Sequence, residues 1–260
     1  MEFLGLRFDN INVDQAMEKI FRLSKSSSFS YVVTPNVDHI VNLYTSSQNE
    51  VADSFKEADL TLCDSRILRF LAKMKGLRLR VVPGSDLTVA LLSACEARKS
   101  IAVVGGNRGL HDALVQKHPS LKWHFHEPPM GVRASEAARR EIGKFVRGAN
   151  ADIILFAIGA PQSEMTCAEI QREPGARGVA LCIGASLEFH VDRKRRAPIW
   201  VQRIAMEWLF RLMTEPERLW RRYLIDGPKI ISIWRAWRPK DATRFSDVSG
   251  STRIDDEKGN

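Results

Sequence analysis

The chain has 260 residues, of which 44% are hydrophobic, so it can bury the core of one large domain, alone or with an appendage. Its formal net charge of +8 indicates an anionic partner, such as a phosphate-bearing substrate, a membrane surface or nucleic acid. We expect no signal peptide and no spanning helix, because the first residues lack that pattern and no apolar run approaches roughly 20 residues. The four cysteines are scattered, which excludes a disulfide framework and a zinc site.

Apolar and amphipathic stretches alternate along most of the chain, which predicts strands and helices in turn. Strands are expected at 6–8, 31–33, 59–65, 101–104, 121–126, 151–159 and 178–185, and helices at 13–25, 37–58 and 67–75, with others opening after the later turns. This alternation predicts an α/β fold with a doubly wound, mainly parallel sheet.

The first turn of interest follows the buried strand at 31–33 and reads Thr34-Pro35-Asn36. A polar turn directly after a buried strand is where α/β folds bind ligands. Pro and Asn also favour plain turns, so these residues alone leave both interpretations open. Thr34 and Asn36 are therefore candidate site residues.

The next strand ends in Cys63-Asp64-Ser65, just before the helix expected at 67–75. A carboxylate at such a position is either a helix cap or a catalytic group. Asp is a preferred cap residue, so the cap is the favoured interpretation of Asp64 when these residues are taken alone.

Two further turns open helices and have features of anion-binding sites. In the turn at 81–87 we expect Ser85 or Asp86 to cap the helix, and the free N–H groups there suit an anion. The glycine turn at 105–109 resembles a nucleotide-binding turn but lacks the full Gly-x-Gly-x-x-Gly fingerprint. These turns supply the candidate binding residues Gly84, Asp86 and Gly105.

The strand expected at 121–126 places His124 and His126 on one face. Two histidines without a third ligand are interpreted as structural, and we expect no metal site. The clearest buried strand, at 151–159, runs into a Gly-Ala-Pro-Gln-Ser-Glu turn. This turn supplies four more candidate binding residues: Gly159, Pro161, Gln162 and Glu164.

The segment after the last strand is basic, aromatic and spaced like a helix. Residues 193–222 include nine Lys or Arg and three Glu, a net charge of +6, and five of the six Trp lie within 200–237. One apolar stripe recurs every four residues: Trp200, Ile204, Trp208 and Leu212. We expect a helical appendage that meets anionic lipid headgroups. The alternative is a helix docked on the domain with a solvated basic face.

Three regions follow from these patterns. We expect an α/β domain at 1–191, a basic and aromatic helical appendage at 192–238, and a polar, charged tail at 239–260 that is disordered.

Together these motifs resemble the WecG/TagA/CpsF family of bacterial glycosyltransferases over 34–223. The resemblance is carried by the Thr-Pro-Asn turn, the strand ending at Asp64, Pro-Gly-Ser-Asp-Leu at 83–87, Gly-Ala-Pro-Gln-Ser-Glu at 159–164, and the run from Arg196-Ala-Pro to Arg222-Tyr. The last run is the most specific. The resemblance implies a Rossmann-like domain with a C-terminal appendage.

The resemblance also implies a function in surface polysaccharide biosynthesis. A hexosyl group such as N-acetylmannosamine, its uronic acid or glucose would move from a UDP-sugar to a polyprenyl-diphosphate-linked saccharide. The protein would be cytoplasmic and peripheral on the inner face of the plasma membrane, whose anionic surface would be a partner. No cofactor and no nucleic acid are implied, and homo-oligomer formation stays open. Asp64 would be the catalytic base, with Thr34 and Asn36 lining its pocket.

The chain departs from the family pattern at three places. Cys63-Asp64-Ser65 stands where the family often has Pro-Asp-Gly, and Val81 stands where an Arg is usual, although Arg80 is adjacent. Ser163 replaces the Gln of Pro-x-Gln-Glu, so we expect Gln162 to substitute from one position earlier. These differences suggest a divergent branch with a different donor sugar.

The chain has no Asp-x-Asp pair, with which many nucleotide-sugar enzymes bind a metal that holds the diphosphate. We therefore expect a metal-independent, inverting reaction in which arginines of the appendage close over the diphosphate. The candidates are Arg196, Arg211, Arg218, Arg221 and Arg222.

Two other functions compete with this interpretation. A nicotinamide-dependent oxidoreductase would use the same architecture, but the glycine fingerprint is incomplete and no acidic residue is clearly placed for a ribose. A nucleic-acid-binding module is suggested only by the charge.

Overall fold

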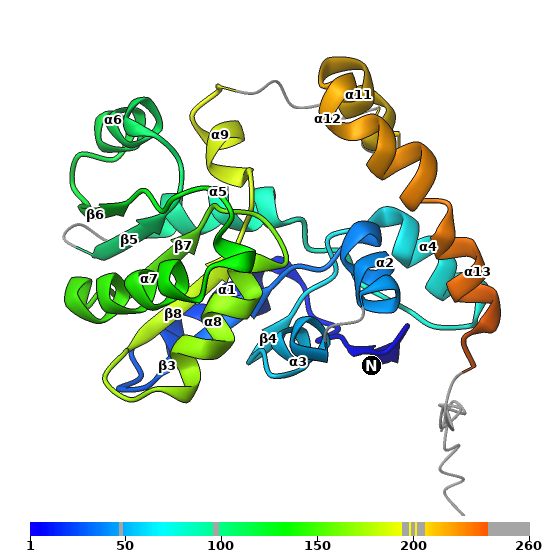
Figure 1. Cartoon of the computed structure of the whole chain (residues 1–260), viewed down its shortest axis with the longest axis horizontal. Coiled ribbons are helices and arrows are strands. Elements are labelled where there is room, and N and C mark those ends of the chain that lie inside the picture. The colour runs from blue at the N-terminus through cyan, green and yellow to red at the C-terminus, as the bar shows by residue number, and fades with distance from the viewer. Residues whose placement is uncertain (47–48, 96–98, 194–197, 199–200, 202–205, 239–260) are drawn as a thin grey trace, which may run out of the picture.

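The computed structural model describes residues 1–46, 49–95, 99–193, 198, 201 and 206–238. Its centre is a six-stranded sheet in the order β4-β3-β8-β7-β5-β6, with parallel pairing throughout (Figure 1). The strands are β3 (Phe29–Val33), β4 (Leu60–Thr61), β5 (Ser100–Val104), β6 (Lys122–His126), β7 (Ile153–Phe156) and β8 (Gly178–Cys182). The predicted doubly wound, Rossmann-like α/β fold is confirmed.

Helices follow the strands in the expected alternation. In the domain they are α1 (Val13–Leu23), α2 (Val37–Thr45), α3 (Asn49–Lys56), α4 (Arg66–Met74), α5 (Gly84–Ala94), α6 (Arg108–Lys117), the short 3₁₀ helix η1 (Val132–Ala134), α7 (Glu136–Ala149), α8 (Gln162–Arg172) and α9 (Ser186–His190). The strand expected at 6–8 lies outside the main sheet. It is β2 (Leu6–Arg7), which pairs antiparallel with β1 (Glu2–Phe3).

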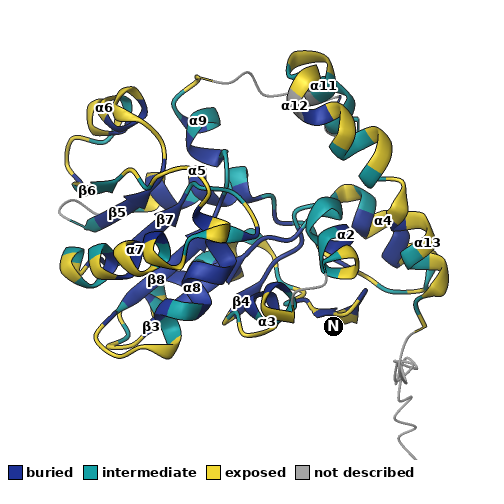
Figure 2. Cartoon of the chain, viewed as in Figure 1, coloured by how far each residue is buried: buried dark blue, intermediate teal, exposed yellow. Residues whose placement is uncertain are grey.

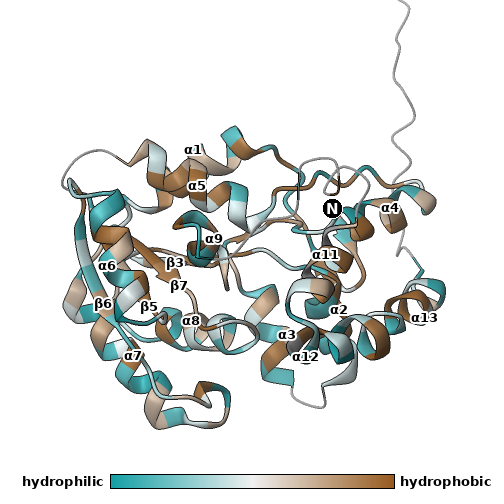
Figure 3. Ribbon diagram, turned by 90° about the horizontal axis from the view of Figure 1, so that it is seen from above, coloured by the Kyte–Doolittle hydropathy of each residue, from teal (hydrophilic) through white to brown (hydrophobic). Residues whose placement is uncertain are grey.

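Two hydrophobic cores lie on opposite faces of the sheet, because successive strand residues point to opposite sides. On β3, Val32 belongs to one core and Val33 to the other. The first core is covered by α1, α5 and α6, and the second by α3, α7 and α8. Figure 3 shows α1 and α5 on one side of the sheet and α7 and α8 on the other. Figure 2 shows that the central strands are buried.

Side-chain caps define where several helices begin. Asn12 caps α1 and Asn36 caps α2, each within a reciprocal capping box. The expectation that Ser85 or Asp86 caps α5 is wrong. Pro83 occupies the cap position without a side-chain hydrogen bond, and Asp86 lies inside the first turn. A carboxylate there still favours the helix dipole.

The C-terminal segment forms α11 (Glu207–Thr214), α12 (Pro216–Trp220), the π-helix η2 (Arg221–Asp226) and α13 (Lys229–Ala236), which run along one side of the domain (Figure 1). Of the predicted stripe, Trp208 and Leu212 lie in α11, whereas Trp200 and Ile204 are outside the described residues. The expected tail at 239–260 is outside them too.

The last helix, α13, packs against the domain. The indole N–H of Trp234 donates to the Leu71 carbonyl oxygen at 3.0 Å, and the Trp237 ring meets Phe3 edge-on with centroids 5.2 Å apart. The Lys75 ammonium lies 4.9 Å from the centre of the Trp234 ring, a cation–π distance. These contacts fix α13 against the domain, and both α13 and η2 contact α2. Within the described part of the chain, no helix has both the length and the apolarity to cross a membrane.

Candidate active site

Three neighbouring strands bring the first group of candidate residues together. Thr34 and Asn36 follow β3, Asp64 follows β4, and Ser186 follows β8. Because β4, β3 and β8 are adjacent and parallel, their carboxyl ends meet at one edge of the sheet. This edge is the location that such folds use for ligands.

Backbone hydrogen bonds continue this arrangement beyond the strands. The Asp64 N–H donates to the Pro35 carbonyl oxygen at 3.0 Å, and the Val82 N–H donates to the Cys63 carbonyl oxygen at 2.8 Å. The second bond aligns the segment before α5 with the end of β4. It therefore places Gly84, the first residue of α5, beside Asp64.

Gly84 lies where three polar side chains converge. A Cβ at this position would be 3.1 Å from Thr34 Oγ1, 3.6 Å from Asp64 Oδ2 and 3.7 Å from Ser186 Oγ. The two hydroxyls donate to backbone carbonyls near the end of β8, at 3.4 Å and 2.7 Å, so the sheet orients them. We call this point of convergence at Gly84 the recess. It is bounded by one carboxylate and two hydroxyls.

Asp64 also lines a pocket of about 140 Å³ between the domain and the appendage. The domain side includes Asn36, Asp38, Ser65 and Arg66, and the appendage side consists of Trp208, Arg222, Tyr223 and Gly227. The Trp208 and Tyr223 rings meet edge-on, with centroids 6.0 Å apart. The appendage therefore forms one wall of the pocket that contains the Asp64 carboxylate.

Arg222 is an appendage cation that contacts the domain beside this pocket. Its Nε lies 3.2 Å from Asp38 Oδ2, and its Nη2 donates to Asn36 Oδ1 at 3.4 Å. Burial raises the pKa of Asp38, whereas the Arg222 guanidinium lowers it. Asn36 thus caps α2 and contacts Arg222 with the same oxygen, so its structural role is confirmed and its role in substrate binding stays a prediction.

The cap of α4 is Ser65, whose hydroxyl accepts the Leu68 N–H at 3.2 Å. The interpretation of Asp64 as the helix cap is therefore wrong. The cap position lies one residue later, and the half-buried carboxylate of Asp64 faces both the recess and the pocket.

A second group of candidate residues lies at the ends of β5 and β7, on the other side of β8. Gly105 has φ +103, and a Cβ there would be 2.8 Å from Ile158 Cγ2, so glycine permits the two turns to approach. Gly159 has φ +79, which only glycine adopts readily, and no atom would meet its Cβ within 4 Å. Pro161 follows a cis peptide bond and precedes α8. None of these residues lines the Asp64 pocket.

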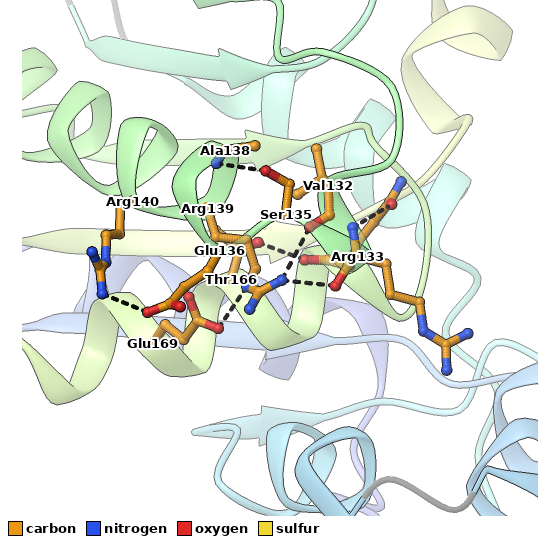
Figure 4. A network of polar contacts seen from close by, with 10 residues as sticks. Val132, Arg133, Ser135, Glu136, Ala138, Arg139, Arg140, Thr166 and Glu169 are labelled. Atoms are coloured by element: carbon orange, nitrogen blue, oxygen red, sulfur yellow. Dashed lines mark hydrogen bonds and ion pairs between the residues drawn. The ribbon is translucent and has the colours of Figure 1, made fainter.

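Gln162 is engaged by the backbone. Its Nε2 donates to the Ile158 carbonyl oxygen, and its Oε1 accepts the Arg133 N–H at 3.3 Å. The segment around Arg133 is held by Arg139, which donates to two carbonyl oxygens of η1 and pairs with Glu169 of α8 at 2.6 Å (Figure 4). In this structure the Gln162 amide supports the turn and does not reach the pocket.

Glu164 is also remote from solvent. Its carboxyl group is buried in the first turn of α8, and Oε2 has no hydrogen-bond partner. Burial raises the pKa of Glu164 to about 8, so the group is largely neutral at pH 7. A neutral buried carboxyl is a core residue in this geometry, and it does not contact the pocket.

A comparison with known protein families decides between the classes of function. The sequence model of the glycosyl transferase family WecG/TagA/CpsF matches residues 1–243. The chain belongs to this family.

Two relatives from Staphylococcus aureus illustrate the family. The protein of strain MRSA252 is 23% identical over 230 residues, which cover 85% of this chain and 87% of the relative. The protein of strain COL is 22% identical over 229 residues, with the same coverage. Both are named N-acetylglucosaminyldiphosphoundecaprenol N-acetyl-beta-D-mannosaminyltransferase. Membership in a glycosyl transferase family disfavours the oxidoreductase and nucleic-acid-binding alternatives.

In this family member the structure separates the five candidate arginines. Arg222 lines the pocket, whereas Arg221, its neighbour in η2, is exposed and does not. Arg211 and Arg218 lie in α11 and α12, and Arg196 is outside the described residues. Among the described residues, no three His, Cys, Asp or Glu side chains are grouped so that they could hold a metal ion.

Sequence reasoning missed Asp38, Ser186 and the role of Trp208. Asp38 is the ion-pair partner of Arg222, but nothing in the sequence distinguishes it from an ordinary residue in the first turn of a helix. Ser186 follows the glycine turn after the last strand, and that position could have indicated it. Trp208 was assigned to an apolar stripe, yet it faces the pocket.

Proposed function

We propose that this chain is an inverting glycosyltransferase that moves a sugar from a UDP-sugar to a polyprenyl-diphosphate-linked saccharide in surface polysaccharide biosynthesis. One observation supports it above all: the Asp64 carboxylate borders both the recess at Gly84 and a pocket whose far wall carries Arg222. A base and a cation on one cavity suit transfer to a hydroxyl with a diphosphate leaving group.

In the proposed reaction, Asp64 accepts the proton of the acceptor hydroxyl as its oxygen attacks the anomeric carbon of the donor. The bond from that carbon to the diphosphate breaks, and UDP leaves with the electron pair. Thr34 and Asn36 bind the substrates from the end of β3, and the hydroxyl of Ser186 adds a third polar group. Inversion follows because the attack and the departure occur on opposite faces of the sugar.

Arg222 supplies positive charge for the departing diphosphate. Arg196, Arg211, Arg218 and Arg221 are the further appendage candidates, for the diphosphate or for acidic lipid headgroups. Gly105, Gly159 and Pro161 are the further donor-contact candidates, at the turns after β5 and β7, and Gln162 and Glu164 support these turns from within the fold. Gly84 and Asp86 lie in the first turn of α5, beside the recess. The free N–H groups of this first turn suit an anion.

The names of the relatives indicate the substrates. They suggest an N-acetylmannosamine donor and an undecaprenyl-diphosphate-linked N-acetylglucosamine acceptor, with the uronic acid or glucose as alternative donors for a divergent member. A lipid-linked acceptor implies action at the cytoplasmic face of the plasma membrane, with the chain bound peripherally.

The test is a donor screen with a short-chain polyprenyl-diphosphate-linked N-acetylglucosamine acceptor, with products detected by mass spectrometry. Asp64→Asn should lower transfer by about two to four orders of magnitude, the usual contribution of a general base, and keep donor binding. Asp112→Asn, which removes an exposed carboxylate on α6, is the matched control and should keep full activity. EDTA should leave the rate nearly unchanged. Near-normal turnover of Asp64→Asn would refute the assignment of the base.

A further inference from the structure

We propose that the outer face of α4 is a docking surface for an anionic lipid bilayer. This inference goes beyond the basic appendage, because α4 lies in the α/β domain, directly after Asp64. Only one part of this inference rests on the proposed function, namely that a bilayer bound to α4 brings the pocket close to a lipid-linked acceptor.

The charge around α4 is of one sign. Residues 66–80 include six Lys or Arg and no Asp or Glu. This is the same net charge, +6, that residues 193–222 carry, and no acidic side chain of the segment offsets it. An uninterrupted cationic segment of this kind is complementary to acidic headgroups.

The exposed face of α4 combines three of these cations with apolar side chains. Leu68, Leu71 and Ala72 are buried against the domain. The exposed residues recur with helical spacing on the opposite face: Arg66, Arg69, Phe70, Lys73 and Met74. Figure 3 shows hydrophilic and hydrophobic residues alternating along α4.

Phe70 is 60% exposed and Met74 is 56% exposed, and they are one turn apart. Single exposed apolar residues are common in soluble proteins and need no explanation. Two large ones on successive turns of one helix face, flanked by cations, have the composition of a helix that lies in the membrane interface. Their apolar parts would enter the headgroup region, while Arg69 and Lys73 would contact phosphates.

The position of α4 gives this surface a consequence for the site. Arg66 and Ile67, in its first turn, line the pocket that contains Asp64, opposite Trp208 and Arg222 of the appendage. The same helix that carries Phe70 and Met74 thus forms part of the pocket wall. A bilayer bound to α4 would hold the pocket close to its surface, where a lipid-linked acceptor lies.

The experiment uses the full chain and vesicles of equal parts phosphatidylglycerol and phosphatidylcholine, with binding measured by co-sedimentation. We compare Phe70→Ser/Met74→Ser and Arg69→Gln/Lys73→Gln with the unaltered chain. Val115→Ser/Met130→Ser, which changes exposed apolar residues elsewhere, and Arg22→Gln/Lys25→Gln, which removes the same charge from the region of α1, are the controls.

Arg69→Gln/Lys73→Gln should bind these vesicles at least tenfold more weakly, since two basic residues near an acidic surface contribute on the order of thirtyfold. Phe70→Ser/Met74→Ser should also bind at least tenfold more weakly, since burying one large apolar side chain contributes about tenfold or more. The controls should bind like the unaltered chain, and vesicles of phosphatidylcholine alone should bind none of the proteins well. Transfer to a short-chain, water-soluble acceptor should be unchanged in both α4 variants.

Unchanged vesicle binding of both α4 variants would overturn the proposal. So would a change in oligomeric state or in DNA binding without any change in vesicle binding, because the surface would then serve a second copy or a nucleic acid. If the unaltered chain transfers no sugar while its vesicle binding depends on α4, the proposed function fails and the lipid-docking surface stands.

Discussion

The substitution Gly84→Ala tests whether the recess is required for activity, because it should alter the recess without destabilising the fold. The new methyl group would enter the recess, 3.1 Å from Thr34 Oγ1 and 3.6 Å from Asp64 Oδ2. The first distance is shorter than an ordinary carbon–oxygen contact, so the Thr34 side chain would move by a few tenths of an ångström. The methyl group would also occupy space between the carboxylate and the hydroxyls.

The effect on folding should be small or favourable. Gly84 begins α5 and does not have a left-handed backbone, so alanine can adopt its conformation. Alanine in a helix is favoured over glycine by roughly 0.5–1 kcal/mol, which offsets the crowding at Thr34. Misplacement by about 1 Å can cost on the order of a hundredfold in rate, so we expect a loss of about tenfold to a hundredfold in kcat/KM.

The assay compares Gly84→Ala with Gly148→Ala under the conditions of the donor screen. Gly148 is exposed in α7, and a Cβ there would meet no atom within 4 Å, so this control should gain stability and keep full activity. Thermal unfolding should show no loss of Tm in either variant. Full activity of Gly84→Ala would refute the assignment of the recess to the active site. A lower Tm of this variant would show that any loss of activity comes from misfolding, which would also contradict the reasoning.

Two further predictions concern charged side chains. Arg222→Gln should lower transfer to a water-soluble acceptor by at least tenfold, because it removes one of the two arginines that line the pocket and takes from Asp38 its ion-pair partner. Arg221→Gln should affect only vesicle binding, and equal effects of both variants would contradict this division. Burial favours the neutral form of the Glu164 carboxyl in the folded chain and raises its pKa from 4.5 to about 8. Between these pH values the folded chain therefore binds more protons than the unfolded chain. The free energy of unfolding should therefore fall by about 1.4 kcal/mol per pH unit as the pH rises through this range. Urea unfolding at several pH values should show a flatter dependence for Glu164→Gln, and an unchanged slope would contradict this.

The fold was predictable because each strand has a local signal. Runs of apolar residues, such as 151–159, mark buried strands, and the alternation with helices indicates a parallel sheet. Boundaries were less accurate: β4 has two residues where a longer strand was expected, although backbone hydrogen bonds from Leu62 to Val33 and from Asp64 to Pro35 continue the pairing beyond it. The cap of α4 was misplaced for a related reason, since Asp64 and Ser65 are both good cap residues and only the backbone geometry distinguishes them.

The site was predictable in part. Thr34, Asn36, Asp64 and Gly84 follow or precede elements that converge on one edge of the sheet, and position along the chain reveals this. The tertiary contacts of the site could not be predicted. Neither the pairing of Arg222 with Asp38 nor the position of Trp208 at the pocket has a local signal in the sequence. For the same reason the engagement of the Gln162 amide by the backbone of Ile158 could not be predicted.

The contact between Phe3 and Trp237 has a consequence for how the protein matures on the ribosome. Phe3 is fully buried, yet one of the rings that cover it comes from Trp237, which lies 234 residues later in the chain. Until Trp237 emerges, α13 cannot pack on Phe3, and the wall made by Trp208 and Arg222 lacks that support. A nascent chain can therefore complete its sheet early but acquires a finished pocket only once α13 has been made. Premature termination before α13 should thus yield a protein with a sheet and no pocket wall.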